Sequence, residues 1–292
     1  MGKGAALKTA FRYILGNMPD AEGAVTADSD GQHLPEDIKA VMDEVHKDKD
    51  VLILGVRDFD KAGVPWKSRT GNKITKTVMS FLCGVKVSDT QTGLRGIPVG
   101  LIKKLINVKY DRFEFETEML VIAVKDYKLK EVKISTVYDS AVSHQTHFNA
   151  WKDSFSIYRI LFGTFFKYIF VSVSSFAIDI LLFSLACVIL KKACPETYIM
   201  ISTAVARAIS SVYNFLMNKK KVFTSESPIG NSACRYFLLA FIQLWLSAFF
   251  VTGISNMARN VPETVIKTGV DTVLFFVNYT LQRTWVFKKN KK

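Results

Sequence analysis

The second half of this chain carries four long apolar stretches, and these restrict its fold more than any other feature. They cover residues 165–190, 198–217, 236–254 and 265–277, and the last continues to residue 287. A helix that spans a bilayer needs about 20 mostly apolar residues. Segments such as 237–251 have almost no polar face, which argues against the alternative of a soluble all-helical core. The sequence therefore predicts an all-α, four-helix transmembrane domain over 165–292.

The formal net charge of +13 raises the alternative of a nucleic-acid binder. Much of the excess, however, lies beside the apolar stretches, in the connection that holds Lys219, Lys220, Lys221 and Arg235, and in the lysines after residue 287. Cationic flanks of this kind are typical of cytoplasmic segments of membrane proteins. We therefore expect a multi-pass protein of the cytoplasmic membrane with both chain ends in the cytoplasm, and no nucleic-acid partner. The four cysteines have no metal-like spacing, and disulfides are not expected.

Two segments of the apolar half resemble each other. Residues 214–223 and 278–287 place Asn, an aromatic residue, a basic residue and Val-Phe at the same offsets. Lys167-Tyr168 likewise precedes the first stretch as Arg235-Tyr236 precedes the third. This pattern predicts a duplicated two-helix hairpin with both copies in one orientation. In transporters built from repeats, substrate sites lie between the repeats.

Three charged residues lie inside the expected spans, namely Asp179, Arg207 and Asp271. A charge in the hydrocarbon costs about 3 kcal/mol or more, so such residues usually face partners or a water-filled path. We expect Arg207 to pair with Asp179 or Asp271. Two interpretations stay open: the pair fixes helix packing, or it contacts an anionic lipid phosphate.

The first half alternates apolar runs of strand length with helical patterns. Strands are expected at 23–27, 51–56 and 132–135, and helices at 4–15, from Pro35, and at 68–83, 99–106 and 113–127. This order is typical of an α/β layer fold with a largely parallel sheet, here over residues 1–150. Residues 151–164 predict an amphipathic helix at the membrane surface, linking the two domains.

Asp28 and Asp30 follow the first expected strand, at the edge where ligands of such sheets bind. Their spacing puts both carboxylates on one side of an extended chain, which favours a hard cation, Mg²⁺ or Mn²⁺. Basic side chains that suit phosphate oxygens follow at Arg57, Arg69, Lys73 and Arg95. His144 and His147 have a metal-like spacing but no acidic or cysteine partner, and we do not expect them to bind metal.

The ordered set resembles the family 2 glycosyltransferases, with the dolichol-phosphate mannose synthase and bactoprenol glucosyltransferase group as the nearest branch. The motifs are Gly2-Lys3-Gly4, Asp28-x-Asp30-x-Gln32-His33, Arg57, Arg69 and Thr92-Gly93-Leu94-Arg95. The second half is similar to GtrA-like membrane proteins, which are associated with moving lipid-linked sugars. The resemblance implies a GT-A-like fold and transfer of a sugar from a nucleotide-sugar donor to polyprenyl (undecaprenyl) phosphate, at a lipid bilayer. Whether the protein forms an oligomer is left open.

The resemblance also implies roles for individual residues. Asp28, Asp30 and Gln32 would hold the metal, Arg57, Arg69 and Lys73 would receive the acceptor phosphate, and Lys3 and Arg95 would complete the site. Proteins of this family open with a further βαβ unit that binds the nucleoside, so we expect an N-terminally truncated domain. The competing interpretation is a catalytically dead fragment whose membrane domain translocates lipid-linked sugar.

Overall fold

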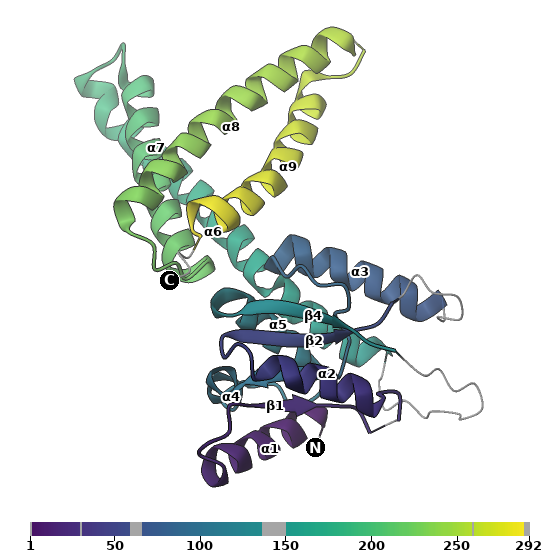
Figure 1. Cartoon of the computed structure of the whole chain (residues 1–292). Helices are drawn as coiled ribbons and strands as arrows, with labels where there is room; N and C mark the ends of the chain where they lie inside the picture. Colours follow the sequence, from purple (N-terminus) through teal and green to yellow (C-terminus); the bar gives the residue numbers. More distant parts are fainter. Residues whose placement is uncertain (1, 30, 59–65, 136–149, 259, 289–292) are drawn as a thin grey trace. The chain divides into compact units, whose positions relative to one another are not determined.

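The computed structural model describes residues 2–29, 31–58, 66–135, 150–258 and 260–288. The chain divides into two compact units, Met1–Phe162 and Gly163–Lys292. Asp30, His144 and His147 lie outside the described residues, so the expectations for them stay predictions. Figure 1 labels most of the helices and strands of both units.

The first unit is built on a four-stranded sheet with the order β1-β3-β2-β4. The strands are β1 (Gly23–Thr26), β2 (Val51–Val56), β3 (Arg95–Pro98) and β4 (Lys128–Lys133). β2 and β4 pair in parallel, whereas β3 runs antiparallel to both β1 and β2. The expectation of a largely parallel sheet is therefore corrected to a small mixed sheet.

The missed strand β3 has a physical explanation. It contains only four residues, and two of them are Gly96 and Pro98, which are depleted in strands. Gly96 is required there because a Cβ atom would collide with Val45 and crowd Ile53. The strand is defined by close packing against its neighbours, and such packing leaves no local pattern in the sequence from which it could be predicted. β4 also begins earlier than the expected 132–135 strand.

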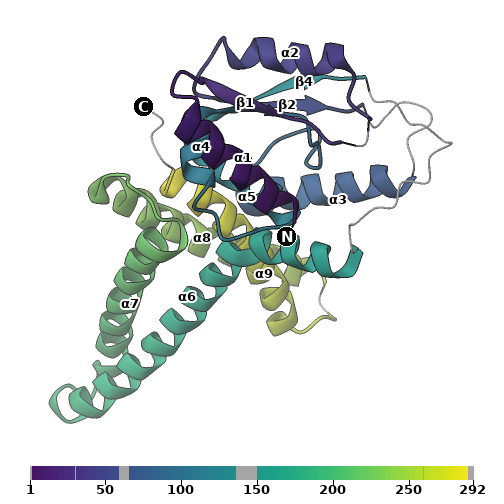
Figure 2. The ribbon, with the colours of Figure 1, turned by 90° about the horizontal axis from the view of Figure 1, so that it is seen from below.

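Helices cover both faces of this sheet (Figure 2). α2 (Pro35–Val45) lies on one face, and α1 (Lys3–Asn17), α4 (Val99–Leu105) and α5 (Glu114–Asp126) lie on the other. α3 (Trp66–Cys83) completes the helices of the sheet domain. Val41 and Val45 of α2 pack on Val51 and Ile53 of β2. All six residues of β2 are buried, which accounts for its continuous apolar sequence.

The second unit consists of long helices joined as two hairpins. α6 (Ala150–Ala193) and α7 (Tyr198–Met217) form the first, and α8 (Ile229–Met257) and α9 (Glu263–Leu281) form the second. α7 and α9 each end in a π-helical turn, η1 (Asn218–Val222) and η2 (Gln282–Val286). Segment 151–164, expected as a separate surface helix, belongs to the first part of α6.

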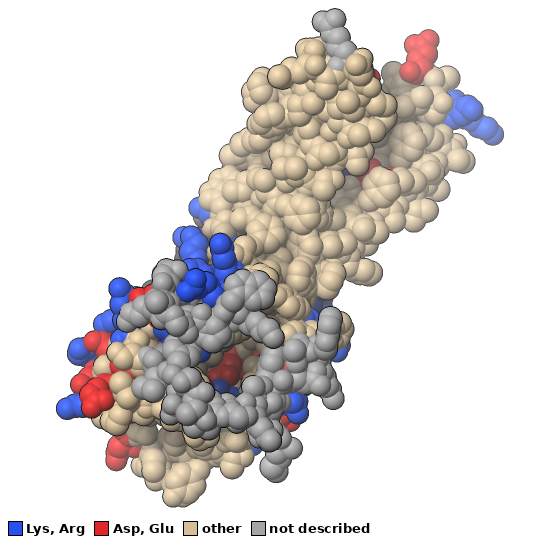
Figure 3. All heavy atoms as spheres, turned by 90° about the vertical axis from the view of Figure 1, so that its right-hand side faces the viewer, with Lys and Arg blue, Asp and Glu red and all other residues tan. Residues whose placement is uncertain are grey.

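Three of these helices are long and apolar enough to cross a membrane: Asp153–Ala193, Tyr198–Val222 and Ile229–Met257. α9, which carries Lys267 and Asp271, is not among them, so the expected number of four spans is not confirmed. Large apolar side chains such as Phe170, Leu181 and Phe241 are about 70 % exposed. In Figure 3 the helical unit shows mostly uncharged residues, while charged ones gather over the sheet domain. An apolar exterior of this extent fits contact with lipid.

Candidate functional site

Asp28 lies just beyond the end of β1, where the side chains of Lys3 and His33 approach its carboxylate. Lys3 of α1 places its Nζ atom 2.6 Å from Asp28 Oδ1 and 3.0 Å from Oε1 of Glu116 in α5. The His33 Nε2 atom lies 3.8 Å from Asp28 Oδ2. On the remaining side the backbone of Gly93 approaches so closely that a Cβ atom there would collide with the carboxylate. Only glycine leaves room for Asp28 in this arrangement.

The electrostatics of this cluster keep Asp28 ionised. The interaction with the His33 ring and the Lys3 ammonium hold the pKa of Asp28 well below its ordinary 3.8, although burial opposes them. Burial by itself lowers the pKa of Lys3, but the attraction of Glu116 and Asp28 outweighs it and the pKa of Lys3 is raised. The cluster therefore holds a carboxylate and an ammonium in contact over the whole neutral range.

Arg95 was expected to contact phosphate, and this stays a prediction; in the structure its side chain contacts the protein itself. Its side chain is fully buried, with Nε donating to the carbonyl of Thr92 at 2.9 Å and Nη1 donating to the carbonyl of Glu116 at 2.8 Å. Arg95 therefore positions the loop before β3, which carries Gly93, and the start of α5, which carries Glu116. A ligand in solvent does not reach this guanidinium without displacing those elements.

Arg57, at the end of β2, forms a two-pronged pair with Asp89. Its Nε atom donates to Oδ2 at 2.7 Å and its Nη2 atom to Oδ1 at 3.2 Å. Asp89 is fully buried and also accepts a bond from the backbone N–H of Gln91 at 2.9 Å. Arg57 keeps a partly exposed side chain, at 18 %, whose charge is already balanced.

The other two expected phosphate ligands lie on α3. Arg69 and Lys73 are exposed and stand one helical turn apart. Asn72, between them, is buried: it donates to the carbonyl of Ser88 at 2.8 Å and accepts from the backbone N–H of Thr90 at 3.1 Å. α3 is thus attached to the same loop, residues 88–95, that carries Asp89, Gly93 and Arg95.

In the structure, four of the predicted site residues therefore lie in two separate groups. Lys3, Asp28 and Arg95 belong to one group and Arg57 to the other, while the 88–95 loop takes part in both. Sequence reasoning missed Glu116 and Asp89, which hold Lys3 and Arg57 respectively. The only available signal for Asp89 was its place in the motif that also holds Arg95.

The described residues alone do not complete a metal site. No group of three His, Cys, Asp or Glu side chains suitable for a metal occurs within the described ranges. Asp28 offers a carboxylate of the right chemistry, but its Oδ1 atom already accepts from Lys3. Gln32 is half-buried, and Asp30 is outside the described residues. A cation at this place would depend on Asp30, and it stays a proposal.

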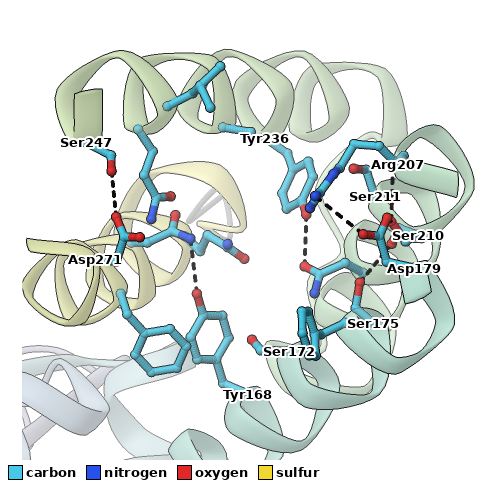
Figure 4. Close-up of a pocket in the computed structure, with 18 of the residues that line it drawn as sticks. Tyr168, Ser172, Ser175, Asp179, Arg207, Ser210, Ser211, Tyr236, Ser247 and Asp271 are labelled. Carbon is cyan, nitrogen blue, oxygen red and sulfur yellow. Dashed lines mark hydrogen bonds and ion pairs between the residues drawn. The ribbon is translucent and has the colours of Figure 1, made fainter. Parts of the chain in front are cut away.

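The helical unit holds a polar cavity of about 480 Å³ between its helices (Figure 4). Arg207 of α7 lies on one side, with its Nη2 atom 3.4 Å from Asp179 Oδ2 of α6, so the expected pairing of Arg207 with Asp179 is confirmed. The other oxygen of Asp179 accepts a bond from Ser210 at 2.8 Å. Figure 4 shows Asp271 on the opposite side, where it accepts bonds from Ser247 at 2.6 Å and from Lys267 at 2.7 Å.

Comparison with known proteins finds one matching family model and two similar archaeal proteins. Residues 163–287 match the family model of the GtrA/DPMS transmembrane domain. A protein of uncharacterised function from Methanocaldococcus jannaschii is 35% identical over 142 residues, which are 47% of this chain and 58% of the relative. A UDP-N-acetylglucosamine–dolichyl-phosphate N-acetylglucosaminyltransferase of Methanococcus voltae is 33% identical over 144 residues, 47% of this chain and 56% of the relative.

The chain thus spans a little over half the length of the curated relatives it matches. The family match and the exposed apolar helices make it a membrane protein. Its residues 163–287 are similar to the GtrA/DPMS transmembrane domain, and part of the chain is similar to an archaeal protein named as a glycosyltransferase.

Proposed function

We propose that this protein takes part in the transfer of a sugar from a nucleotide-sugar donor to a polyprenyl phosphate in the cytoplasmic membrane. The observation that carries the proposal is the environment of Asp28. An ionised carboxylate stands at the end of β1, enclosed by Lys3 and the Gly93 backbone, in an α/β unit joined to a membrane domain. The related transferase of Methanococcus voltae, by its name, uses a nucleotide sugar and a dolichyl phosphate.

The arrangement supports a division of tasks. Asp28, together with Asp30, would hold Mg²⁺ or Mn²⁺ on the diphosphate of the donor, where the ion would neutralise charge on the departing nucleotide. Arg69 and Lys73 present cations from α3 that suit an incoming phosphate. Since a phosphate acceptor is already anionic, the reaction needs no strong general base. Arg57 and Arg95 would hold the 88–95 loop in place rather than bind substrate.

The test is sugar transfer from a panel of nucleotide sugars to undecaprenyl phosphate, in membranes that contain the full chain. Asp28→Asn should lower the rate about 100-fold, the order of loss seen when one electrostatic group is removed from a reaction site. Asp126→Asn is the matched control, because Asp126 pairs with Lys104 at an exposed place away from β1. Transfer that survives in Asp28→Asn at the rate of the control would refute the proposal.

A second function is favoured by one observation, the polar cavity in the membrane unit. In this version the membrane domain moves a lipid-linked sugar and the sheet domain is inactive. It predicts that liposomes containing the chain translocate a fluorescent isoprenyl-phosphate sugar, and that Asp28→Asn translocates it equally well. Transfer activity that depends on Asp28 would reject this alternative.

A further inference from the structure

The two hairpins of the membrane unit are related by an approximate two-fold axis. Tyr236 of the second hairpin donates its hydroxyl to Asn214 Oδ1 of the first at 2.8 Å. The equivalent residues make the reciprocal contact, with Asn278 Nδ2 at 3.2 Å from the Tyr168 hydroxyl. Each hairpin therefore contributes the tyrosine of one pair and the asparagine of the other. The duplication seen in the sequence therefore appears in the structure as two equivalent hydrogen bonds between the hairpins.

Equivalent residues also touch each other directly, which marks where the axis runs. Asn218 Nδ2 donates to Gln282 Oε1 at 3.2 Å, and the rings of Phe223 and Phe287 stack with centroids 5.3 Å apart. These four residues hold the same positions in the two repeats. A side chain that meets its own equivalent must lie beside the symmetry axis. The axis thus passes through the layer formed by η1 and η2.

The polar cavity continues from this layer and is lined by equivalent positions from both hairpins. Tyr168 and Tyr236 line it, as do Asn214 and Asn278. Farther along the helices the pairs diverge. The position of Asp179 in the first hairpin holds Ser247 in the second, and that of Arg207 holds Asp271. The cavity is symmetric at the η1–η2 layer and asymmetric in charge about two helical turns away.

The Arg207 guanidinium is less satisfied than Asp271, which lines the opposite side of the cavity with its partner Lys267. Among the described residues, the Arg207 guanidinium makes one ion-pair contact, at 3.4 Å, and its side chain is 70 % exposed. Asp271, in contrast, accepts bonds on both carboxylate oxygens, from Ser247 and Lys267. A guanidinium has five N–H donors in a planar fork. Most of the Arg207 donors are therefore available to a ligand in the cavity.

We propose that this cavity binds the phosphate head group of a lipid, with Arg207 as the phosphate contact. A planar guanidinium fork matches two phosphate oxygens, and a cation at membrane depth usually serves a ligand or a charge pathway. The other charged residues of the lining are already in ion pairs: Asp179 contacts Arg207, and Lys267 contacts Asp271. Uncharged donors and acceptors such as Ser172, Ser211 and Gln243 complete the polar lining. The volume of about 480 Å³ lies in the ordinary range for small-ligand sites.

The asymmetry gives the bound head group one orientation. Phe176 and Leu244 line the cavity and are themselves equivalent residues of α6 and α8, so an isoprenyl or acyl chain meets apolar surface from either hairpin. Each hairpin presents one cation to the phosphate, but the two cations are held differently. The Lys267 ammonium lies 2.7 Å from Asp271, whereas Arg207 lies 3.4 Å from Asp179 and keeps most of its donors for another ligand. The lipid phosphate therefore binds at Arg207, toward α7.

The inference deepens the proposed function, because it names lipid phosphates as ligands of the membrane unit, yet its test needs no sugar transfer. The probe is farnesyl phosphate, titrated calorimetrically into the full-length chain in a non-ionic detergent. Farnesol and inorganic phosphate serve as comparison ligands that separate the apolar chain from the phosphate. Arg207→Gln should weaken binding of farnesyl phosphate about 10- to 100-fold, as expected for the loss of charge-assisted hydrogen bonds.

Three further variants keep the result interpretable. Arg207→Gln alone leaves Asp179 without its cation, so Arg207→Gln/Asp179→Asn removes the pair together and should show the same loss of affinity in a folded protein. Lys192→Gln removes a charge at the end of α6, outside the cavity lining, and should leave affinity within about twofold. Asp271→Asn should bind as tightly as the parent or more tightly.

The outcomes separate clearly. Inorganic phosphate binding that also depends on Arg207 would keep the phosphate site and assign its source to a soluble phosphate rather than a lipid. Equal binding of farnesol and farnesyl phosphate, or unchanged affinity in the double variant, would overturn the site. Asp271→Asn weakening as much as Arg207→Gln would overturn the one-sided orientation. An Asp28→Asn protein that binds normally but transfers nothing would leave this inference standing, whatever the fate of the transferase proposal.

Discussion

Replacing Asp89 by asparagine should destabilise the sheet domain more than any other single loss of charge in it. The Asp89 carboxylate is fully buried; it accepts two bonds from the Arg57 guanidinium, one from the Arg57 backbone N–H and one from the Gln91 backbone N–H. Removing one partner of a buried pair costs about 3–5 kcal/mol, because the other charge is left uncompensated. Since the Arg57 side chain is 18 % exposed, water compensates part of this loss. We expect about 3 kcal/mol.

For a unit of this size, 1 kcal/mol lowers the melting temperature by about 2–4 °C, so Asp89→Asn should lower it by about 6–12 °C. Scanning fluorimetry of the full-length chain measures the shift, and hydrogen exchange in peptides from β2 and β3 assigns it to the sheet domain. The control is Asp126→Asn, whose partner Lys104 is exposed, and it should cost at most about 1 kcal/mol. Equal shifts for the two variants would refute the reasoning.

Three other predictions follow from single contacts. Gly93→Ala should cost about 1–3 kcal/mol in the unfolding free energy and abolish sugar transfer, because its Cβ atom displaces the Asp28 carboxylate; a wild-type melting temperature would contradict this. Burial raises the pKa of Glu118 above its ordinary 4.5, so the folded state binds the proton more tightly than the unfolded state does. The free energy of unfolding should therefore fall as the pH rises from 4.5 through the raised pKa of the folded state. Glu118→Gln should remove this slope from a pH series of melting temperatures. Asn218→Leu should cost about 1 kcal/mol in detergent unfolding, and a double variant with Gln282→Leu should cost less than the sum of the two.

The sequence was most informative where a local pattern has one physical cause. Apolar runs without a polar face identified the membrane unit. Short apolar runs located β1 and β2, and helical patterns located α1, α2, α4 and α5, within a few residues. Pro35 at the first turn of α2 was expected from its fixed backbone angle. These features depend on neighbours in sequence, so they need no knowledge of the tertiary fold.

The environments of charged side chains were not predictable in the same way. Arg57 and Arg95 both looked like phosphate ligands, yet one is balanced by Asp89 and the other donates to two backbone carbonyls inside the domain. Whether an arginine faces solvent or a buried partner is decided by contacts across long sequence separations. Such contacts leave no periodicity in the sequence, and Glu116, which holds Lys3, was missed for the same reason.

The duplicated hairpin offers a different kind of evidence, because it compares two copies of one design inside a single chain. At the η1–η2 layer the copies keep similar residues and pair with each other, as Phe223 does with Phe287, which is what an interface that only joins two hairpins requires. At the level of Arg207 and Asp271 each copy holds one ion pair, but the pairs are built differently. The first copy has a guanidinium 3.4 Å from its carboxylate, and the second has an ammonium 2.7 Å from its carboxylate. A purely structural layer has no need for this difference. A site that binds a phosphate at one place does, since a planar guanidinium with available donors suits phosphate oxygens better than an ammonium already held by an acid.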